Sequence, residues 1–269
     1  VKVELRDEAD LLGRHGTESL TRFGLVWPPG HYMMAPLLEV IQGGSVVTGQ
    51  GGDEVLGRQR VAPFTRLLKG GPARRQALAE CARELGPRKL RRRILRERMR
   101  ERGARAWLLP AAHEAFLDAV VDDLLEEPLR WKDGVRSVLA RRVTQVALRN
   151  QAILGREMGI RYVRPFLDGR FVEAFAHSGG VLGFPDRRAA MHHLFGHLLP
   201  SEVIRRRSKA AFNTVAIGPE SRAFIARWDG RGIDSGLVDP EKLEAAWLAP
   251  HPNAGSLVLL QAAWLAHNR

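Results

Sequence analysis

Two patterns of apolar and polar residues follow one another along the chain. Val46 and Val47 form a short β-branched run, which predicts a buried strand. Ahead of it, residues 1–5 alternate like a strand, and residues 7–12 and 32–41 are expected to be helical. From Val61 onward apolar residues recur at helical spacing between prolines. The expected helices are 73–85, 89–102, 111–125, 135–158, 169–176, 187–198, 219–228, 240–247 and 256–266. The pattern predicts an α/β beginning joined to a large, mostly helical remainder.

The predicted strand ends in a glycine cluster, Thr48-Gly49-Gln50-Gly51-Gly52-Asp53-Glu54, directly before an expected helix start. Glycines permit backbone angles and close approaches that side chains would block, and a helix start attracts anions. Because the two acids need a cation between themselves and an anion, a metal-bridged polyphosphate suits this turn. A plain strand-to-helix connection is the alternative, since the turn matches neither the Walker lysine motif nor the dinucleotide fingerprint.

Composition narrows the class of protein. The 269 residues are 45% apolar and 27% charged, which is typical of a folded globular chain. The single cysteine, Cys81, excludes an internal disulfide framework and favours a reducing compartment, so we expect a cytoplasmic protein with Cys81 buried in a helix. We expect neither a signal peptide nor a membrane span. The net charge of +12 attracts anions such as nucleotides, acidic peptides or nucleic acid.

Arginines are densest within residues 88–105, where only Glu97 and Glu101 oppose them. The arginines of this expected helix are Arg91, Arg92, Arg93, Arg96, Arg98, Arg100 and Arg102. Leu90, Ile94, Leu95 and Met99 form an apolar stripe through which the helix can dock. A nucleic-acid-binding helix is one interpretation, but we favour a plain solvated helix because no aromatic residues are interleaved with the charges. An acidic leader peptide would also suit it.

Two short stretches imitate functional motifs. His193 and His197 are four apart on an expected helix, which is the spacing of two zinc ligands, but no glutamate or third ligand accompanies them. We therefore expect no metal there. Ser178-Gly179-Gly180 imitates the start of a pyrophosphate-binding loop but lacks the following aspartate and serine, so we interpret it as a helix-ending turn.

Three separated stretches resemble one family. The turn at residues 48–54 looks like the second nucleotide motif of the asparagine synthetase family. Pro165-Phe166-Leu167-Asp168, followed by Arg170 and Val172-Glu173, resembles the family's proline-phenylalanine-leucine-aspartate segment. Leu198-Leu199-Pro200, and then Arg207-Ser208-Lys209-Ala210-Ala211-Phe212, resembles its leucine-leucine-proline stretch and its arginine-x-lysine-x-x-phenylalanine signature. The resemblance runs from about Trp27 to the C-terminus.

The resemblance implies a fold and a chemistry. The fold is an α/β, adenine-nucleotide alpha-hydrolase-like domain of the pyrophosphatase-loop type, truncated at its N-terminus. One synthetase domain spans 1–269, with 1–68 a remnant of the nucleotide-binding core and 69–269 mostly helical. ATP with Mg²⁺ adenylates a carboxylate, AMP and pyrophosphate are released, and an amine attacks to form an amide.

The resemblance also assigns residues. It implies that Thr48, Gly49, Gly51, Gly52 and Asp53 bind ATP. Asp53 holds Mg²⁺ against the phosphates, and Lys209 places a positive charge at the leaving pyrophosphate and the developing anion. A surface lysine in a basic tract is the alternative for Lys209.

Departures from the family pattern bear on the substrate. Neutral Gln50 stands where asparagine-making members usually carry an acid, and Arg161 stands where they usually carry a glutamate. Because of these two residues, we expect substrates other than ammonia and aspartate. Lasso peptide cyclases, which close a peptide into a macrolactam, look similar here. The expected partner is then a carboxylate-bearing substrate, such as a precursor peptide with its leader-binding protein.

The family's first motif, Ser-Gly-Gly-x-Asp-Ser, has no match before Thr48. We expect either that residues upstream of Val1 carry it or that this chain is a relative that does not turn over. Two other functions stay open. One is asparagine synthesis from ammonia or glutamine-derived nitrogen, and the other is a non-catalytic scaffold that binds a peptide or nucleic acid.

Overall fold

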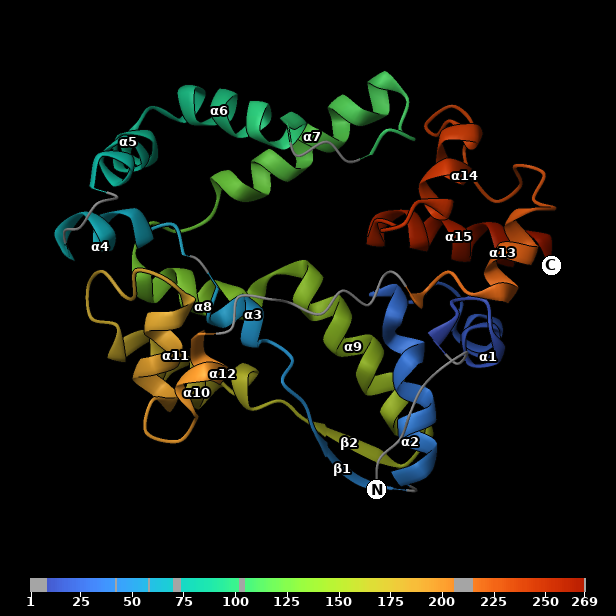
Figure 1. Cartoon of the computed structure of the whole chain (residues 1–269), viewed down its shortest axis with the longest axis horizontal. Coiled ribbons are helices and arrows are strands. Elements are labelled where there is room, and N and C mark those ends of the chain that lie inside the picture. Colours follow the sequence, from blue (N-terminus) through green and yellow to red (C-terminus); the bar gives the residue numbers. More distant parts are fainter. Residues whose placement is uncertain are drawn as a thin grey trace.

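The chain is described by a computed structural model, which covers residues 9–41, 43–57, 59–69, 74–101, 105–205 and 215–268 (Figure 1). This part of the chain is mostly helical, with one small parallel sheet, as the apolar pattern predicts. The sheet lies at one side of the molecule, and helices α5 to α7 lie at the opposite side. None of the helices described is both long and apolar enough to cross a membrane.

The sheet pairs two strands that are distant in sequence, β1 (Gly44–Val47) and β2 (Ile160–Val163). They run parallel, with Gly44 opposite Ile160. Helices α2 (Ala35–Ile41) and α9 (Arg142–Glu157) lie beside the pair, and Leu38 packs with Ile160 and Tyr162 in a small core. The predicted strand at Val46 and Val47 is therefore confirmed, but its predicted burial is wrong, because Val47 is 72% exposed. The strand expected at residues 1–5 lies outside the described residues. The sequence analysis also missed β2, whose four residues are too few to show a clear period.

A second core supports the glycine turn. Val55 and Leu56, at the end of the short helix α3 (Gly52–Val55), are buried beside Trp131, which makes edge-to-face contacts with Phe175 and Phe184 at centroid distances of 5.3 and 5.5 Å. The other helices around this core are α4 (Ala62–Lys69), α8 (Trp131–Ala140), α10 (Gly169–Ser178) and α11 (Arg187–Phe195). Apolar packing of α3 in this core therefore supports the glycine turn that precedes it.

A third core joins the two ends of the described chain. Leu11, Leu20 and Tyr32 pack with Phe224 and Trp247. The elements involved are α1 (Arg14–Phe23), the 3₁₀ helix η2 (Pro29–Met34), α13 (Pro219–Ile225), α14 (Pro240–Leu248) and α15 (Ala254–His267). The sequence analysis missed α1. Its expected helix at 7–12 is wrong over the residues that the structure describes, because Leu11 and Leu12 lie in a turn.

Buried Asp10 explains that turn. Its carboxylate accepts hydrogen bonds from the backbone N–H groups of Leu12, Glu220 and Ser221, at 3.2, 2.8 and 3.2 Å. Glu220 and Ser221 begin helix α13, so the carboxylate satisfies N–H groups that have no partner within their own helix. A helix through Asp10 would direct this side chain elsewhere.

The predicted long helix at 135–158 is two helices, α8 and α9. Arg141 lies between them in an extended conformation (φ −60°, ψ 128°), and its guanidinium lies 3.6 Å from Glu127. The remaining predicted helices are confirmed within a few residues at their ends. They include α5 (Arg74–Leu85), on which Cys81 is buried, α6 (Arg88–Glu101) and α7 (Pro110–Leu125), and the short helix α12 (Ser201–Arg205) is additional.

Candidate functional site

The glycine turn continues directly from the sheet. The Thr48 N–H donates to the carbonyl of Val163 at 2.9 Å, so the turn begins at the carboxyl end of β1, next to that of β2. The Gly52 N–H then donates to the Gly49 carbonyl at 3.1 Å, and the Val55 N–H to the Gly51 carbonyl at 2.8 Å. The predicted order of strand, tight turn and helix start is therefore confirmed. The carboxyl end of parallel strands is where ligands bind in open α/β sheets.

Two of the resembling segments meet in space. The segment after β2 forms a short 3₁₀ helix, η3 (Pro165–Leu167), and packs on the turn. Gly51 has a φ of 91°, and a Cβ there would lie 2.3 Å from Cγ of Leu167. A Cβ on Gly52 would lie 3.4 Å from the ring of Phe166. Gly51 is thus required by both its backbone angle and the neighbouring side chain.

Asp168 ends this segment and has a structural task. Its carboxylate accepts a 2.9 Å hydrogen bond from the backbone N–H of Arg170 and so caps helix α10. The Arg170 guanidinium, 3.3 Å away, lowers the pKa of Asp168 below its usual range, with the backbone hydrogen bond as a further cause. Asp168 therefore ends η3 and begins α10.

The opposite side of the turn is open. Gly49 is exposed, and a Cβ built on it would meet no atom within 4 Å. Asp53 is also exposed, and its carboxylate lies 2.6 Å from the Arg187 guanidinium at the start of α11. Among the described residues, no group of three or more histidines, cysteines and carboxylates could hold a metal ion. Because Mg²⁺ often takes one or two carboxylates and completes its shell with phosphates and water, Asp53 alone fits a phosphate-bridged Mg²⁺.

Gln50 contacts an arginine that the sequence analysis did not single out. The Arg164 guanidinium donates to the side-chain oxygens of Gln50 and Gln151, at 3.2 and 3.0 Å, and lies over the ring of Tyr162. Burial lowers the pKa of Arg164, and burial together with Arg164 lowers the pKa of His31 to about 4. Arg164 is thus a partly buried cation beside the turn, and the sequence could have pointed to it through its position immediately before Pro165.

Arg161 was named together with Gln50 as a departure from the family pattern, but it lies on β2 and away from Gln50. It is exposed, stands opposite Ser45 in the register, and its guanidinium is 3.4 Å from the Ser45 hydroxyl. The structure therefore brings Gln50 to Arg164 rather than to Arg161. Lys209, with Arg207, Ser208 and Phe212, lies outside the described residues, so its role stays a prediction.

The structure gives both stretches that imitate functional motifs, at His193 and His197 and at residues 178–180, an ordinary structural explanation. Helix α11 ends at Phe195, so His197 lies beyond it and the predicted helical pair with His193 is wrong. His193 packs against Phe184, with ring centroids 4.9 Å apart. Ser178 ends α10, and Gly180 has a φ of 63°, which confirms the helix-ending turn.

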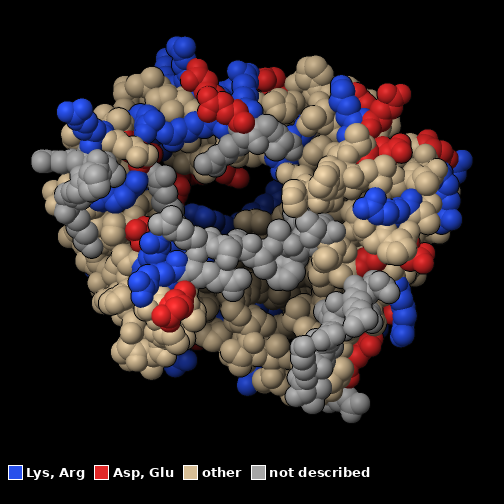
Figure 2. All heavy atoms as spheres, viewed as in Figure 1, with Lys and Arg blue, Asp and Glu red and all other residues tan. Residues whose placement is uncertain are grey.

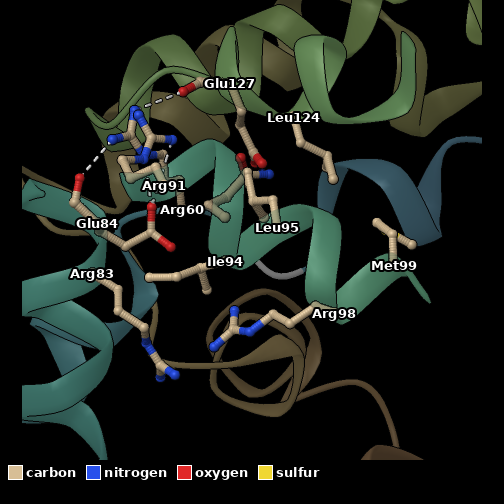
Figure 3. A pocket seen from close by; sticks show the side chains of 11 residues that line it. Arg60, Arg83, Glu84, Arg91, Ile94, Leu95, Arg98, Met99, Leu124 and Glu127 are labelled. Atoms are coloured by element: carbon tan, nitrogen blue, oxygen red, sulfur yellow. Dashed lines mark hydrogen bonds and ion pairs between the residues drawn. The ribbon is translucent and has the colours of Figure 1, made fainter. Parts of the chain in front are cut away.

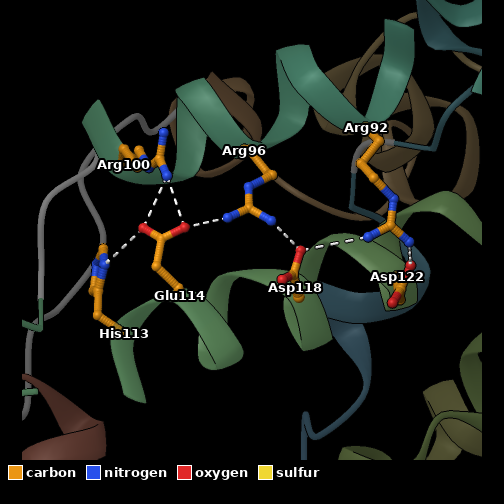
Figure 4. Close-up of polar contacts among 7 residues, drawn as sticks. All are labelled: Arg92, Arg96, Arg100, His113, Glu114, Asp118 and Asp122. Carbon is orange, nitrogen blue, oxygen red and sulfur yellow. Dashed lines mark hydrogen bonds and ion pairs between the residues drawn. The ribbon is translucent and has the colours of Figure 1, made fainter. Parts of the chain in front are cut away.

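The basic helix α6 is neutralised on one face by α7. Glu114 of α7 accepts from Arg96 and from Arg100, the latter at 2.7 Å, and Asp118 and Asp122 pair with Arg92 (Figure 4). No residue of α6 is fully buried, but Ile94, Leu95 and Met99 of the expected docking stripe are half-buried. Leu90, at the start of the stripe, is 49% exposed. Carboxylates of α7, and not only solvent, therefore balance the positive charges of Arg92, Arg96 and Arg100.

Comparison with known families agrees with the three resembling segments. The chain matches the family model described as asparagine synthase over residues 28–265. Because this match covers most of the chain, the protein belongs to the asparagine synthase family, whose members are ATP-dependent amide-forming ligases. A search of curated proteins and a search of solved structures each found no match.

Proposed function

We propose that this protein is an AMP-forming synthetase that joins a carboxylate to an amine within a peptide or specialised metabolite. The observation that carries the proposal is the contact between the glycine turn and η3, because two segments more than a hundred residues apart form one surface at the ends of β1 and β2. A pyrophosphatase-loop type of α/β fold is part of the proposal. It is supported by the parallel strand pair with its turn at the carboxyl end of β1.

The proposed roles follow the chemistry of the turn. Gly49 gives ATP access to the backbone, and Thr48, Gly51 and Gly52 shape the turn around it. Asp53 would hold Mg²⁺ against the phosphates while Arg187 supplies a further positive charge. A carboxylate oxygen of the substrate attacks the α-phosphorus and pyrophosphate leaves. The amine then attacks the activated carbonyl carbon, AMP leaves, and the amine proton passes to a base or solvent. Lys209 would stabilise the charge that develops in both steps.

The surroundings of Gln50 favour a peptide amine over ammonia or aspartate. Its side-chain oxygen accepts from Arg164, so this corner of the turn carries a neutral amide and a cation. An acid there would attract a small protonated amine, whereas a neutral amide next to a cation does not, so the amine has to be placed by the rest of its own molecule. Lasso-peptide-like macrolactam closure is the form of the reaction that we propose. Asparagine synthesis is its alternative within the family.

The test measures AMP and pyrophosphate with the full-length protein, ATP and Mg²⁺. Lys209→Ala should lower turnover by about a hundredfold or more, because a preorganised charge at the reacting centre is removed. Lys89→Ala is the matched control, since Lys89 is an exposed lysine of α6 far along the chain from the turn. Unchanged turnover in Lys209→Ala would refute the assignment. Product formation from aspartate and ammonia, but not from peptide, would select asparagine synthesis.

A further inference from the structure

A cavity that the proposed reaction does not use lies at the opposite side of the molecule from the sheet. It has a volume of about 290 Å³ and is bounded by α5, α6, α7 and the segment at Gln59 and Arg60 (Figure 3). One wall is aliphatic and consists of Ile94, Leu95, Met99 and Leu124. The cavity is close to the size of a small-ligand site. On the face seen in Figure 2 the molecule is hollowed near its centre, below α6 and α7, with both basic and acidic side chains around the opening.

Two of the cavity's arginines are held by the protein itself. The Arg60 guanidinium donates to the Glu84 carboxylate at 2.9 Å and to the backbone carbonyls of Glu84 and Glu127 at 2.8 and 3.0 Å. The Arg91 guanidinium lies 3.8 Å from the same Glu84 carboxylate. Glu127 in turn pairs with Arg141. Both carboxylates that line the cavity, those of Glu84 and Glu127, are therefore already paired with arginines.

Arg83 of α5 and Arg98 of α6 are different. Both line the cavity and are half-buried, and neither has an ion pair or a side-chain hydrogen bond within the part of the chain that the structure describes. Figure 3 shows both guanidinium groups on the same side of the cavity, near Ile94. Two cations on one side of a partly enclosed space repel each other unless an anion lies between them. Next to an aliphatic wall, they favour a ligand that is both anionic and apolar.

We propose that this cavity binds a peptide segment in which a carboxylate is next to an aliphatic side chain. The carboxylate lies between Arg83 and Arg98, where guanidinium groups bind it by charge-assisted hydrogen bonds. The aliphatic side chain packs on Leu95, Met99 and Leu124. The inference rests on the proposed function only in naming the carrier, which is the peptide substrate of the synthetase.

Nucleic acid fits this surface less well. None of the described residues that line the cavity is aromatic, so bases would find no stacking partner among them. A phosphate backbone also needs a row of available cations, and Arg92, Arg96 and Arg100 of the same helix are already paired with α7. What remains on the cavity side is two adjacent charges beside an apolar wall, which matches one acidic residue and its neighbour.

The experiment measures binding without ATP, by fluorescence anisotropy of a short labelled peptide in which glutamate and leucine alternate. We expect Arg83→Ala and Arg98→Ala each to weaken binding by about tenfold, since each removes one hydrogen bond to a charged group. The double variant should weaken it further. Arg93→Ala is the matched control, because Arg93 lies on the same helix, is exposed and pairs with Glu97 of its own helix. It should bind the peptide like the unsubstituted chain.

Two altered peptides separate the two halves of the proposed ligand. Replacing glutamate by glutamine should remove the dependence on Arg83 and Arg98, and replacing leucine by serine should weaken binding to all variants alike. Neither arginine has an ion pair or a side-chain hydrogen bond among the described residues, and equal thermal melting of the variants checks that they stay folded. No binding by the unsubstituted chain, an equal loss in Arg93→Ala, or tighter and equally arginine-dependent binding of a single-stranded oligonucleotide would overturn the proposal. Because ATP is absent, a failed synthetase assay leaves this result intact.

Discussion

The glycine turn and the contact between α6 and α7 are stabilised by different means. At the turn, Gly51 lies against Leu167, and the polar support behind it, Arg164, is partly buried. Between α6 and α7, partly exposed arginines pair with partly exposed carboxylates such as Glu114. A closely packed residue cannot be enlarged without a steric clash. A solvent-accessible ion pair contributes little to the free energy of unfolding and is screened by salt. Substitutions should therefore be severe at the turn and mild on the helical pair.

The largest effect should come from Gly51→Ala. The new Cβ would lie 2.3 Å from Leu167 at a residue whose φ is 91°. Backbone strain and overpacking each cost 1 to 3 kcal/mol, so we expect the free energy of unfolding to fall by about 4 kcal/mol. Urea denaturation measures it. Gly49→Ala, two residues away with open space around it, should change that free energy by less than about 0.5 kcal/mol. Equal effects of the two substitutions would show that the turn does not pack on Leu167.

A smaller effect should appear in the pH dependence. His31 is 6% exposed and has its pKa lowered to about 4 by burial and then by Arg164, so it is neutral when folded. The unfolded chain takes up a proton near pH 6.5, which the folded chain does not. Stability from this residue is therefore complete above pH 6.5 and is lost as pH falls to 4, by about 3 kcal/mol.

The variant His31→Gln isolates this effect, because other groups also titrate in the same range. The difference in unfolding free energy between the unsubstituted chain and the variant should change between pH 7 and pH 4, with the unsubstituted chain losing more on acidification. Urea denaturation at the two pH values measures it. If the two proteins lose stability in parallel, His31 is not held neutral beside Arg164.

The same contrast explains what the sequence could predict. The turn was recognisable because its requirements are local: consecutive glycines follow β-branched residues and precede acids. Its partner segment was recognisable through resemblance, but the contact of Arg164 with Gln50 was not, since β2 is too short to show a period. The arginines of α6 look equivalent in sequence. Only the position of α7 and α5 distinguishes Arg96, which is paired, from Arg98, which has no ion pair among the described residues.

The smallest effect should come from Glu114→Gln on α7. Glu114 pairs with Arg96 and Arg100, and its pKa is lowered by the hydrogen bond from Arg100 and by the charges of both arginines. Its contribution is present above its ordinary pKa and is lost as pH falls below it. We expect thermal melting at neutral pH and low salt to show a loss of stability smaller than that from His31. The loss should vanish in about 1 M salt, where charges are screened within about 3 Å. Asp123→Asn is the control, because Asp123 is an exposed residue of the same helix without an ion pair in the described part of the chain, and it should change nothing at either salt concentration. A loss that persists in high salt would mean that α6 and α7 are held together by packing, and the contrast with the turn would then fail.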